Sequence, residues 1–216
     1  MRHSFVTRIA ALLCLLWFSA SAQVDLQTLL KGVESHYNRA KTLEVQFNEG
    51  YTGVGGPRQS ESGRLTLRKP GRMRWDYSMP PGKLFVSDGK QVFLYSPELN
   101  RVERMPLKQS EDMRAPLAFL LGKLDFAREF RDIQMKPAGA DYLVTAGAKS
   151  DRLPYEKIEM VVTPGFAIRR LVVNGQDQSV LTFQFDQEKL NPPVDDARFH
   201  FKPPAGSTVV SGESAQ

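Results

Sequence analysis

The sequence predicts a mainly β protein in which a curled antiparallel sheet has helices packed against its concave face. Three observations predict this fold class. An amphipathic helical pattern gives way at Leu43 to apolar residues at every second position, which is typical of half-buried strands. Turn sequences rich in glycine, proline and aspartate separate these short segments. One strongly apolar helical segment interrupts them, and no strand-helix-strand alternation is present.

The first 22 residues have the pattern of a secretory signal peptide. Arg2 and Arg8 give a positive start, and Ile9 to Phe18 forms an apolar core that is short for a membrane span. The triplet Ala20-Ser21-Ala22 is typical of a cleavage site. We therefore expect a mature chain that begins at Gln23 outside the cytoplasm. The competing interpretation, an uncleaved membrane anchor, fits the short core less well.

Composition indicates one domain that is not built on disulfides. The single cysteine, Cys14, lies in the apolar core of the signal segment, and Leu13 stands where an acylation site requires a small residue. Removing Arg2 and Arg8 from the 29 lysines and arginines leaves 27 against 24 acidic residues, a net charge of +3. The basic residues are interleaved with apolar ones, which disfavours a nucleic-acid partner. We expect a single domain over residues 23–210 and a flexible tail over 211–216.

An amphipathic helix of about four turns opens the mature chain, because apolar residues recur there at spacings of three and four. Asp25 can cap this helix. The apolar positions are Leu26, Leu29, Leu30, Val33, Tyr37 and Ala40. His36 lies at the border of the apolar face, where we interpret it as a border residue and not a metal ligand.

Strands follow from Leu43, and the first segment alternates up to Asn48. Asp88-Gly89 between two apolar segments is a strong hairpin signal. The pattern predicts about ten or eleven short strands, the last of them at residues 199–201. Between them, residues 107–130 read as helical, with apolar side chains facing nearly all round, so this segment should be covered on more than one side.

No catalytic or metal-binding motif is evident in the sequence. His36 and His200 are far apart, and no P-loop, nucleophile elbow or zinc-protease motif is present. The pair Asp195-Asp196 follows two prolines, so a helix-capping or solvated role is favoured over an acid pair. We expect neither enzymatic activity nor a cofactor.

Four segments, in this order, resemble the outer-membrane lipoprotein carrier family (LolA). They are Leu65–Trp75 (LTLRKPGRMRW), Val86–Tyr95 (VSDGKQVFLY), Ala115–Leu121 (APLAFLL) and Phe199–Gly206 (FHFKPPAG). The resemblance implies an incomplete antiparallel β-barrel with a helical lid over an apolar cavity. It also implies a periplasmic carrier that takes acylated lipoproteins from an inner-membrane ATP-driven extractor and passes them to an outer-membrane receptor.

The resemblance leads us to expect a cargo site with a sheet side and a lid side. The sheet-side candidates are Leu65, Leu67, Met73, Trp75, Leu84, Val86, Phe93 and Tyr95. The lid-side candidates are Tyr37, Leu117, Leu120 and Leu121. Sequence periodicity does not separate a lined cavity from a filled core, so each residue singly is as compatible with core packing as with cargo contact.

Lys69 departs from the family pattern, which has an arginine at this position that binds lid carbonyls in the closed state. Lys69 has the inward parity of Leu65 and Leu67, whereas Arg68 has the outward parity. We expect Lys69 to be the lid latch, with acceptors around Leu120 to Gly122. Lysine offers a point charge in place of a planar fork, so the latch should be weaker or differently arranged.

Other functions fit the same patterns. A secreted carrier or sensor of another lipid or glycolipid would share the scaffold. An outer-membrane receptor would need an acylated N-terminal cysteine, and a lipoprotein sensor would carry an additional C-terminal domain. An enzyme would need a catalytic constellation, and fold analogy alone does not decide between these functions.

Overall fold

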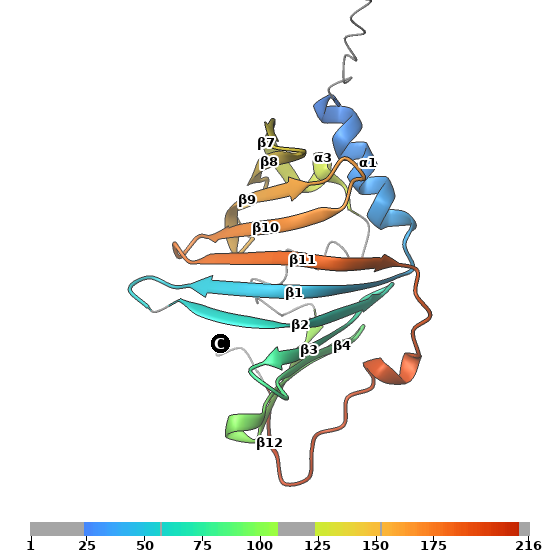
Figure 1. The fold of residues 1–216 in the computed structure, drawn as a ribbon. Coiled ribbons are helices and arrows are strands. Elements are labelled where there is room, and N and C mark those ends of the chain that lie inside the picture. The colour runs from blue at the N-terminus through green and yellow to red at the C-terminus, as the bar shows by residue number, and fades with distance from the viewer. Residues whose placement is uncertain (1–23, 57, 108–123, 152, 212–216) are drawn as a thin grey trace, which may run out of the picture.

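The computed structural model describes residues 24–56, 58–107, 124–151 and 153–211. Twelve strands form one strongly curved sheet in the order β12-β6-β5-β4-β3-β2-β1-β11-β10-β9-β8-β7 (Figure 1). Neighbouring strands are antiparallel, except that β12 runs parallel to β6. The strands are β1 (Thr42–Thr52), β2 (Gln59–Arg68), β3 (Arg72–Met79), β4 (Leu84–Asp88), β5 (Gln91–Ser96), β6 (Arg101–Pro106), β7 (Phe130–Ala138), β8 (Asp141–Ala148), β9 (Tyr155–Val162), β10 (Ile168–Gly175), β11 (Val180–Leu190) and β12 (Thr208–Ser211).

The predicted fold class is confirmed, with small differences. The sheet is unclosed, because β7 and β12 stand at its two ends. It has twelve strands where the sequence suggested ten or eleven. The strand expected at residues 199–201 is wrong. The 3-10 helix η4 (Asp196–Phe199) occupies this region, and the chain returns to the sheet only at β12.

Helix α1 (Leu26–Arg39) confirms the first predicted element. The Asp25 carboxylate caps it by accepting a hydrogen bond from the main-chain N–H of Thr28 at 3.0 Å. Its buried side chains belong to the same core cluster as the sheet residues Leu65 and Trp75. We call the side of the sheet that faces α1 the inner face. The helix approaches the β9–β10 turn so closely that a Cβ on Gly32 would lie 2.2 Å from the Phe166 ring.

Aromatic side chains fill the middle of the inner face. The Trp75 ring is fully buried and lies 4.7 Å from the Phe47 ring and 5.6 Å from the Phe183 ring, measured between centroids. These three side chains come from β3, β1 and β11, which lie near the centre of the strand order. The core therefore joins both halves of the sheet to the underside of α1.

The C-terminal segment crosses the opposite side of the sheet, which we call the outer face. Arg68 donates a hydrogen bond to the Val194 carbonyl at 2.7 Å, and Arg72 pairs with Asp196 at 2.7 Å. Phe199 is 1% exposed, although it lies outside the main core cluster. The strands β3 and β4 therefore have the core on one face and the 3-10 turn of the C-terminal segment, residues 196–199, on the other.

Two further elements complete the described part of the chain. They are the 3-10 helix η1 (Pro97–Leu99) and the single-turn helix α3 (Phe126–Glu129). The helical segment predicted to run to Phe130 ends earlier, because Phe130 is the first residue of β7. Asp195 and Asp196 have the capping and solvated roles expected of them. Asp195 accepts a hydrogen bond from the Ala197 N–H at 2.9 Å, and Asp196 is half-exposed beside Arg72.

Candidate functional site

The inner face of the sheet brings together one half of the predicted sheet-side residues. Leu65 and Leu67 of β2 stand opposite Trp75 and Met73 of β3 in the antiparallel register. All four are buried in the main core cluster. They belong to the same core cluster as Tyr37 of α1, and their contact with cargo stays a prediction.

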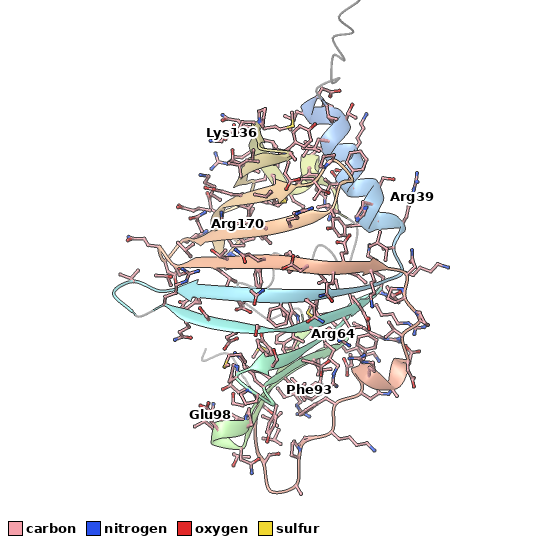
Figure 2. The ribbon with its side chains drawn as sticks, viewed as in Figure 1. Arg39, Arg64, Phe93, Glu98, Lys136 and Arg170 are labelled. Atoms are coloured by element: carbon pink, nitrogen blue, oxygen red, sulfur yellow. The ribbon has the colours of Figure 1, made fainter. Side chains whose placement is uncertain are left out.

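The other half of that set lies on the outer face, and the expectation that it faces the same cavity is wrong. Trp75 pairs with Phe85, and Phe85 pairs with Leu94, so these residues continue the inner face. Each predicted residue lies one position along its strand from an inner residue, so its side chain points to the outer face. These residues are Leu84, Val86, Phe93 and Tyr95. The rings of Phe93 and Tyr95 lie 5.4 Å and 6.4 Å from that of Phe201 in the C-terminal segment, and Phe93 lies beside this segment in Figure 2.

The residues that sequence reasoning missed on the inner face are Phe85, Val92 and Leu94. Phe85 and Val92 are buried in the core, and Leu94 is partly buried against it. The sequence did not indicate these residues because apolar and polar side chains do not alternate along β4. In β4 both Phe85 and Val86 are buried, because each face of this strand has its own cover. The turn sequence Asp88-Gly89 located the hairpin, but it did not indicate which face is the inner one.

The lid-side residues Leu117, Leu120 and Leu121 lie outside the described residues. The chain is described again from Leu124, where α1 holds it. The Asn38 amide forms reciprocal hydrogen bonds of 2.8 Å and 2.7 Å with the carbonyl and N–H of Leu124. The Glu34 carboxylate accepts a hydrogen bond from the N–H of Phe126 at 2.8 Å. Helix α1 therefore holds Leu124 and Phe126 in the core.

The Tyr37 side chain joins α1 to two strands of the sheet, β10 and β11. Its hydroxyl donates a hydrogen bond to Glu188 Oε2 at 2.8 Å and accepts one from the main-chain N–H of Ile168 at 2.8 Å. The other carboxylate oxygen of Glu188 lies 2.7 Å from Nε2 of His36, which is partly buried at the helix border as expected. Burial, and secondly the negative charge of Glu188, raises the pKa of the Tyr37 hydroxyl well above its ordinary value of 10.0.

Lys69 points inward, as its parity predicted, and binds a helix end. Its Nζ donates a hydrogen bond of 2.7 Å to the Tyr37 carbonyl in the last turn of α1. The acceptors expected around Leu120 to Gly122 lie outside the described residues. A cation is favoured at a helix C-terminus, where carbonyls lack helical partners. Burial lowers the pKa of Lys69 below its ordinary value.

Described residues of α1 and of the sheet line a small gap between them. A gap of about 10 Å³, the volume of about one water molecule, remains between Tyr37, Leu65 and their neighbours. The remaining lining residues are Leu43, Val45, Ile168, Leu171, Phe185 and Glu188. This gap is too small for an acyl chain, which could enter it only if the helix or the side chains beneath it moved.

The described residues contain no group of three or more His, Cys, Asp or Glu side chains placed to hold a metal ion. Within the same residues, no helix has both the length and the apolar character required to cross a membrane.

Comparison with known proteins identifies the family. The family described as outer membrane lipoprotein carrier protein LolA matches residues 38–202. An outer-membrane lipoprotein carrier protein of Chromobacterium violaceum is 30% identical over 204 residues, which cover 90% of this chain and 89% of the relative. Its counterpart in Azotobacter vinelandii is 29% identical over 94% of this chain and 97% of the relative.

A solved structure supports the fold alone. An uncharacterized conserved protein from Thermus thermophilus has a TM-score of 0.51 and 14% sequence identity, covering 86% of this chain and 98% of that chain. Since the family match spans well over half of the 216 residues, the chain belongs to the outer membrane lipoprotein carrier protein LolA family.

Proposed function

We propose that this protein is a non-catalytic periplasmic carrier that shields the acyl chains of lipoproteins. In this proposal it receives cargo from an ATP-driven extractor in the inner membrane and delivers it to a receptor at the outer membrane. Family membership supports the proposal, because the curated relatives are outer-membrane lipoprotein carrier proteins. Burying an acyl chain is worth about 0.8 kcal/mol for each CH₂, so transit through water needs an apolar shelter.

The observation that carries the proposal is the way α1 covers the apolar inner face. Beneath the helix lie the large side chains of Leu65 and Trp75, which offer apolar contact of low shape specificity. Polar contacts between the helix and the sheet meet at Tyr37, through Lys69, Glu188 and Ile168. A small set of localised contacts can break and reform as a unit, and this suits a cover that opens for cargo.

We place the cargo contacts on the inner face. The proposed residues are Tyr37, Leu65, Leu67, Met73, Trp75, Phe85, Val92 and Leu94, with Leu117, Leu120 and Leu121 as lid contacts. We also propose export through residues 1–22, after which the protein acts as a monomer. N-terminal sequencing of the protein from the periplasm should begin at Gln23, and retention of Cys14 in the mature chain would contradict this part of the proposal.

Two adjacent residues of β5 provide a matched test. Leu94 faces inward and Phe93 faces outward, so the same substitution can be placed on either side of one strand. Leu94→Gln puts an amide where acyl chains would lie, and we expect purified lipoprotein to bind about tenfold more weakly. Phe93→Gln should leave lipoprotein binding unchanged. Circular dichroism checks that both variants keep the sheet, and equal binding by both variants would contradict the inner-face site.

A further inference from the structure

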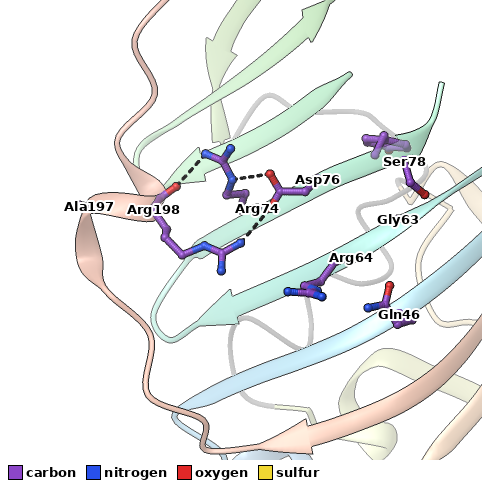
Figure 3. A pocket seen from close by; sticks show the side chains of 9 residues that line it. Gln46, Gly63, Arg64, Arg74, Asp76, Ser78, Ala197 and Arg198 are labelled. Carbon is purple, nitrogen blue, oxygen red and sulfur yellow. Dashed lines mark hydrogen bonds and ion pairs between the residues drawn. The ribbon is translucent and has the colours of Figure 1, made fainter. Parts of the chain in front are cut away.

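A polar groove of about 690 Å³ lies on the outer face of the sheet, opposite the inner face. It is bordered by β1, β2 and β3 on one side and by η4 on the other (Figure 3). The volume falls in the range of small-molecule sites, about 300–1,000 Å³. Its lining residues are Gln46, Gly63, Arg64, Arg74, Asp76, Tyr77, Ser78, Ala197 and Arg198.

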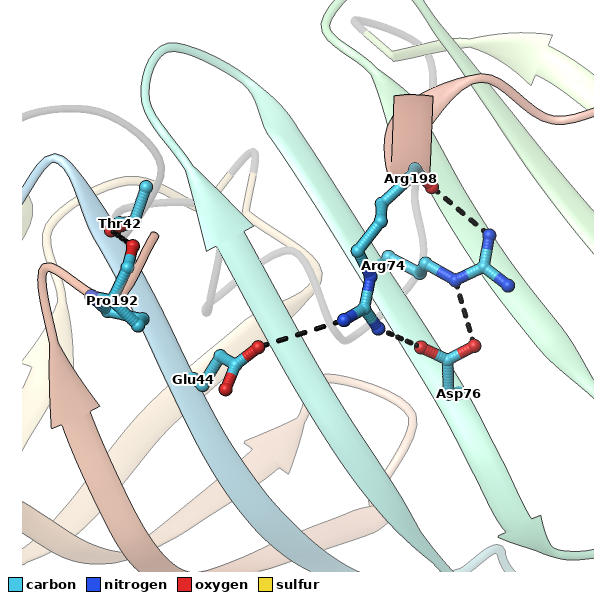
Figure 4. Close-up of polar contacts among 6 residues, drawn as sticks. All are labelled: Thr42, Glu44, Arg74, Asp76, Pro192 and Arg198. Carbon is cyan, nitrogen blue, oxygen red and sulfur yellow. Dashed lines mark hydrogen bonds and ion pairs between the residues drawn. The ribbon is translucent and has the colours of Figure 1, made fainter. Parts of the chain in front are cut away.

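Two of the three arginines are held in place by one carboxylate. Arg74 Nε donates to Asp76 Oδ1 at 2.8 Å, and Arg198 Nη2 donates to Asp76 Oδ2 at 2.9 Å (Figure 4). Arg74 Nη1 also donates to the Arg198 carbonyl at 3.1 Å. Both oxygens of Asp76 are therefore occupied. Arg198 Nη1 also lies 3.7 Å from Glu44 Oε1, so two carboxylates fix the orientations of these two guanidinium groups (Figure 4).

Arg64 has no such carboxylate partner among the residues that the structure describes. It is exposed, and its Nε lies 3.3 Å from the oxygen of the Gln46 amide when that amide donates through its nitrogen to the Gly63 carbonyl at 2.9 Å. This contact orients the guanidinium and leaves both terminal nitrogens free. Figure 3 shows Arg64 on the same side of the sheet as Arg74 and Arg198.

We propose that this groove binds a phosphate group, with Arg64 as the principal ligand and with Arg74 and Arg198 held in fixed orientations elsewhere in its lining. Three arginines against Asp76 and Glu44, which pairs with Arg198 at 3.7 Å, leave a local charge of +1, which favours a phosphate group over a neutral ligand. A free guanidinium edge offers paired N–H donors in the geometry that phosphate oxygens accept. Because the groove lies on the opposite face from the proposed cargo contacts, this inference stands or fails independently of the carrier function.

Titration calorimetry at constant ionic strength tests the proposal, with inorganic phosphate and glycerol phosphate as the probes. Glycerol phosphate should bind the wild-type protein at one saturable site. Arg64→Gln should weaken this binding about tenfold, because it removes the paired N–H donors of the guanidinium without disturbing a buried group. Arg64→Lys should weaken it less, because the charge remains. The matched control is Arg170→Gln, another exposed arginine of the sheet that lies outside the groove, and it should bind like the wild type (Figure 2).

A second measurement identifies the source of the phosphate. Sedimentation of the wild-type protein, but not Arg64→Gln, with phosphatidylglycerol vesicles and not with phosphatidylcholine vesicles would support a lipid headgroup. Binding of glycerol phosphate without vesicle association would support a soluble phosphate ester. The proposal is overturned if the wild-type protein shows no saturable binding, or if Arg64→Gln and Arg170→Gln weaken binding equally, since diffuse surface charge would then be sufficient.

Discussion

The Nζ of Lys69 lies 2.7 Å from the main-chain carbonyl of Tyr37 and joins the end of β2 to the last turn of α1. The adjacent residue Arg68 points to the other side of the sheet and binds the Val194 carbonyl. Two consecutive basic residues therefore secure two different covers, the helix on the inner face and the C-terminal segment on the outer face. Their separate roles can be tested by substituting each in turn.

Replacing Lys69 by Met should loosen the last turn of α1. The variant loses the hydrogen bond to the Tyr37 carbonyl, so amide exchange near the C-terminal end of the helix should be faster than in the wild type. Arg68→Met is the control and should leave exchange in α1 unchanged. Equal exchange in the wild type and Lys69→Met would show that this contact does not hold the helix.

The same residue should affect cargo release. Lys69→Leu removes the contact and adds apolar surface, so lipoprotein should load at least as well but pass poorly to the receptor, because the closed state competes less with cargo. Lys69→Arg restores a donor and should favour release. A transfer assay with the three proteins measures this, and identical loading and unloading would assign Lys69 a purely structural role.

Tyr37→Phe should destabilise the protein in a pH-dependent way. Losing the hydroxyl leaves the Ile168 N–H and a Glu188 oxygen without this partner, at a cost of about 1–3 kcal/mol. The folded state raises the pKa of Tyr37, so above pH 10 the unfolded chain loses the tyrosine proton while the folded chain keeps it. The unfolded state then binds fewer protons, and the stability of the wild type falls as pH rises.

Urea unfolding of both proteins from pH 7 to pH 11 checks this prediction. The advantage of the wild type over Tyr37→Phe should be constant below pH 10 and shrink above it. A difference that stays constant throughout the range would mean that the hydroxyl has the same proton affinity in both states.

Gly63→Ala should be unusually costly for a strand glycine. A Cβ at Gly63 would lie 2.1 Å from the Asp76 carbonyl oxygen, which is main chain and can move only with β3. We expect a loss of about 3 kcal/mol in the free energy of unfolding. Gly147→Ala in β8 is the matched control, since its nearest neighbour would be the Arg131 side chain at 3.5 Å, an ordinary contact. Similar stabilities of the two variants in urea would contradict the predicted clash.

Phe199→Ala should show how firmly the C-terminal segment is attached. The side chain is buried between η4 and the outer face, so its removal should cost about 3–5 kcal/mol. His200→Ala, at an exposed neighbouring position, should change stability by no more than about 0.5 kcal/mol. Thermal unfolding followed by circular dichroism compares the two variants. A mild effect at Phe199 would indicate that the segment is dispensable for the fold.

The sequence predicted the parts of the fold that depend on local patterns. Asp25 and the spacing of Leu29, Val33 and Tyr37 identified α1, because capping and helical periodicity act within a few residues. The parity of Lys69 was also correct, because apolar Leu65 and Leu67 alternate in the sequence with polar Thr66 and Arg68 at the end of β2.

The remainder depends on contacts between distant segments. Phe93 was assigned to the inner face because nothing near it in the sequence indicates that Phe201 covers the outer face. Glu188 was not identified as a partner of Tyr37, since 151 residues separate them and only the β1–β11 pairing brings them together. The outer groove likewise depends on Arg198 approaching Asp76 across 122 residues.

The open edges of the sheet have a consequence for behaviour at high concentration. An unpaired edge strand can template the addition of another chain, which leads to aggregation. Here β7 carries Pro137, which offers no N–H, and the charged residues Arg131 and Lys136 are exposed beside it. At the other end β12 has only four residues. Each edge is thus a poor template, so the barrel can stay unclosed without polymerising edge to edge in a crowded compartment.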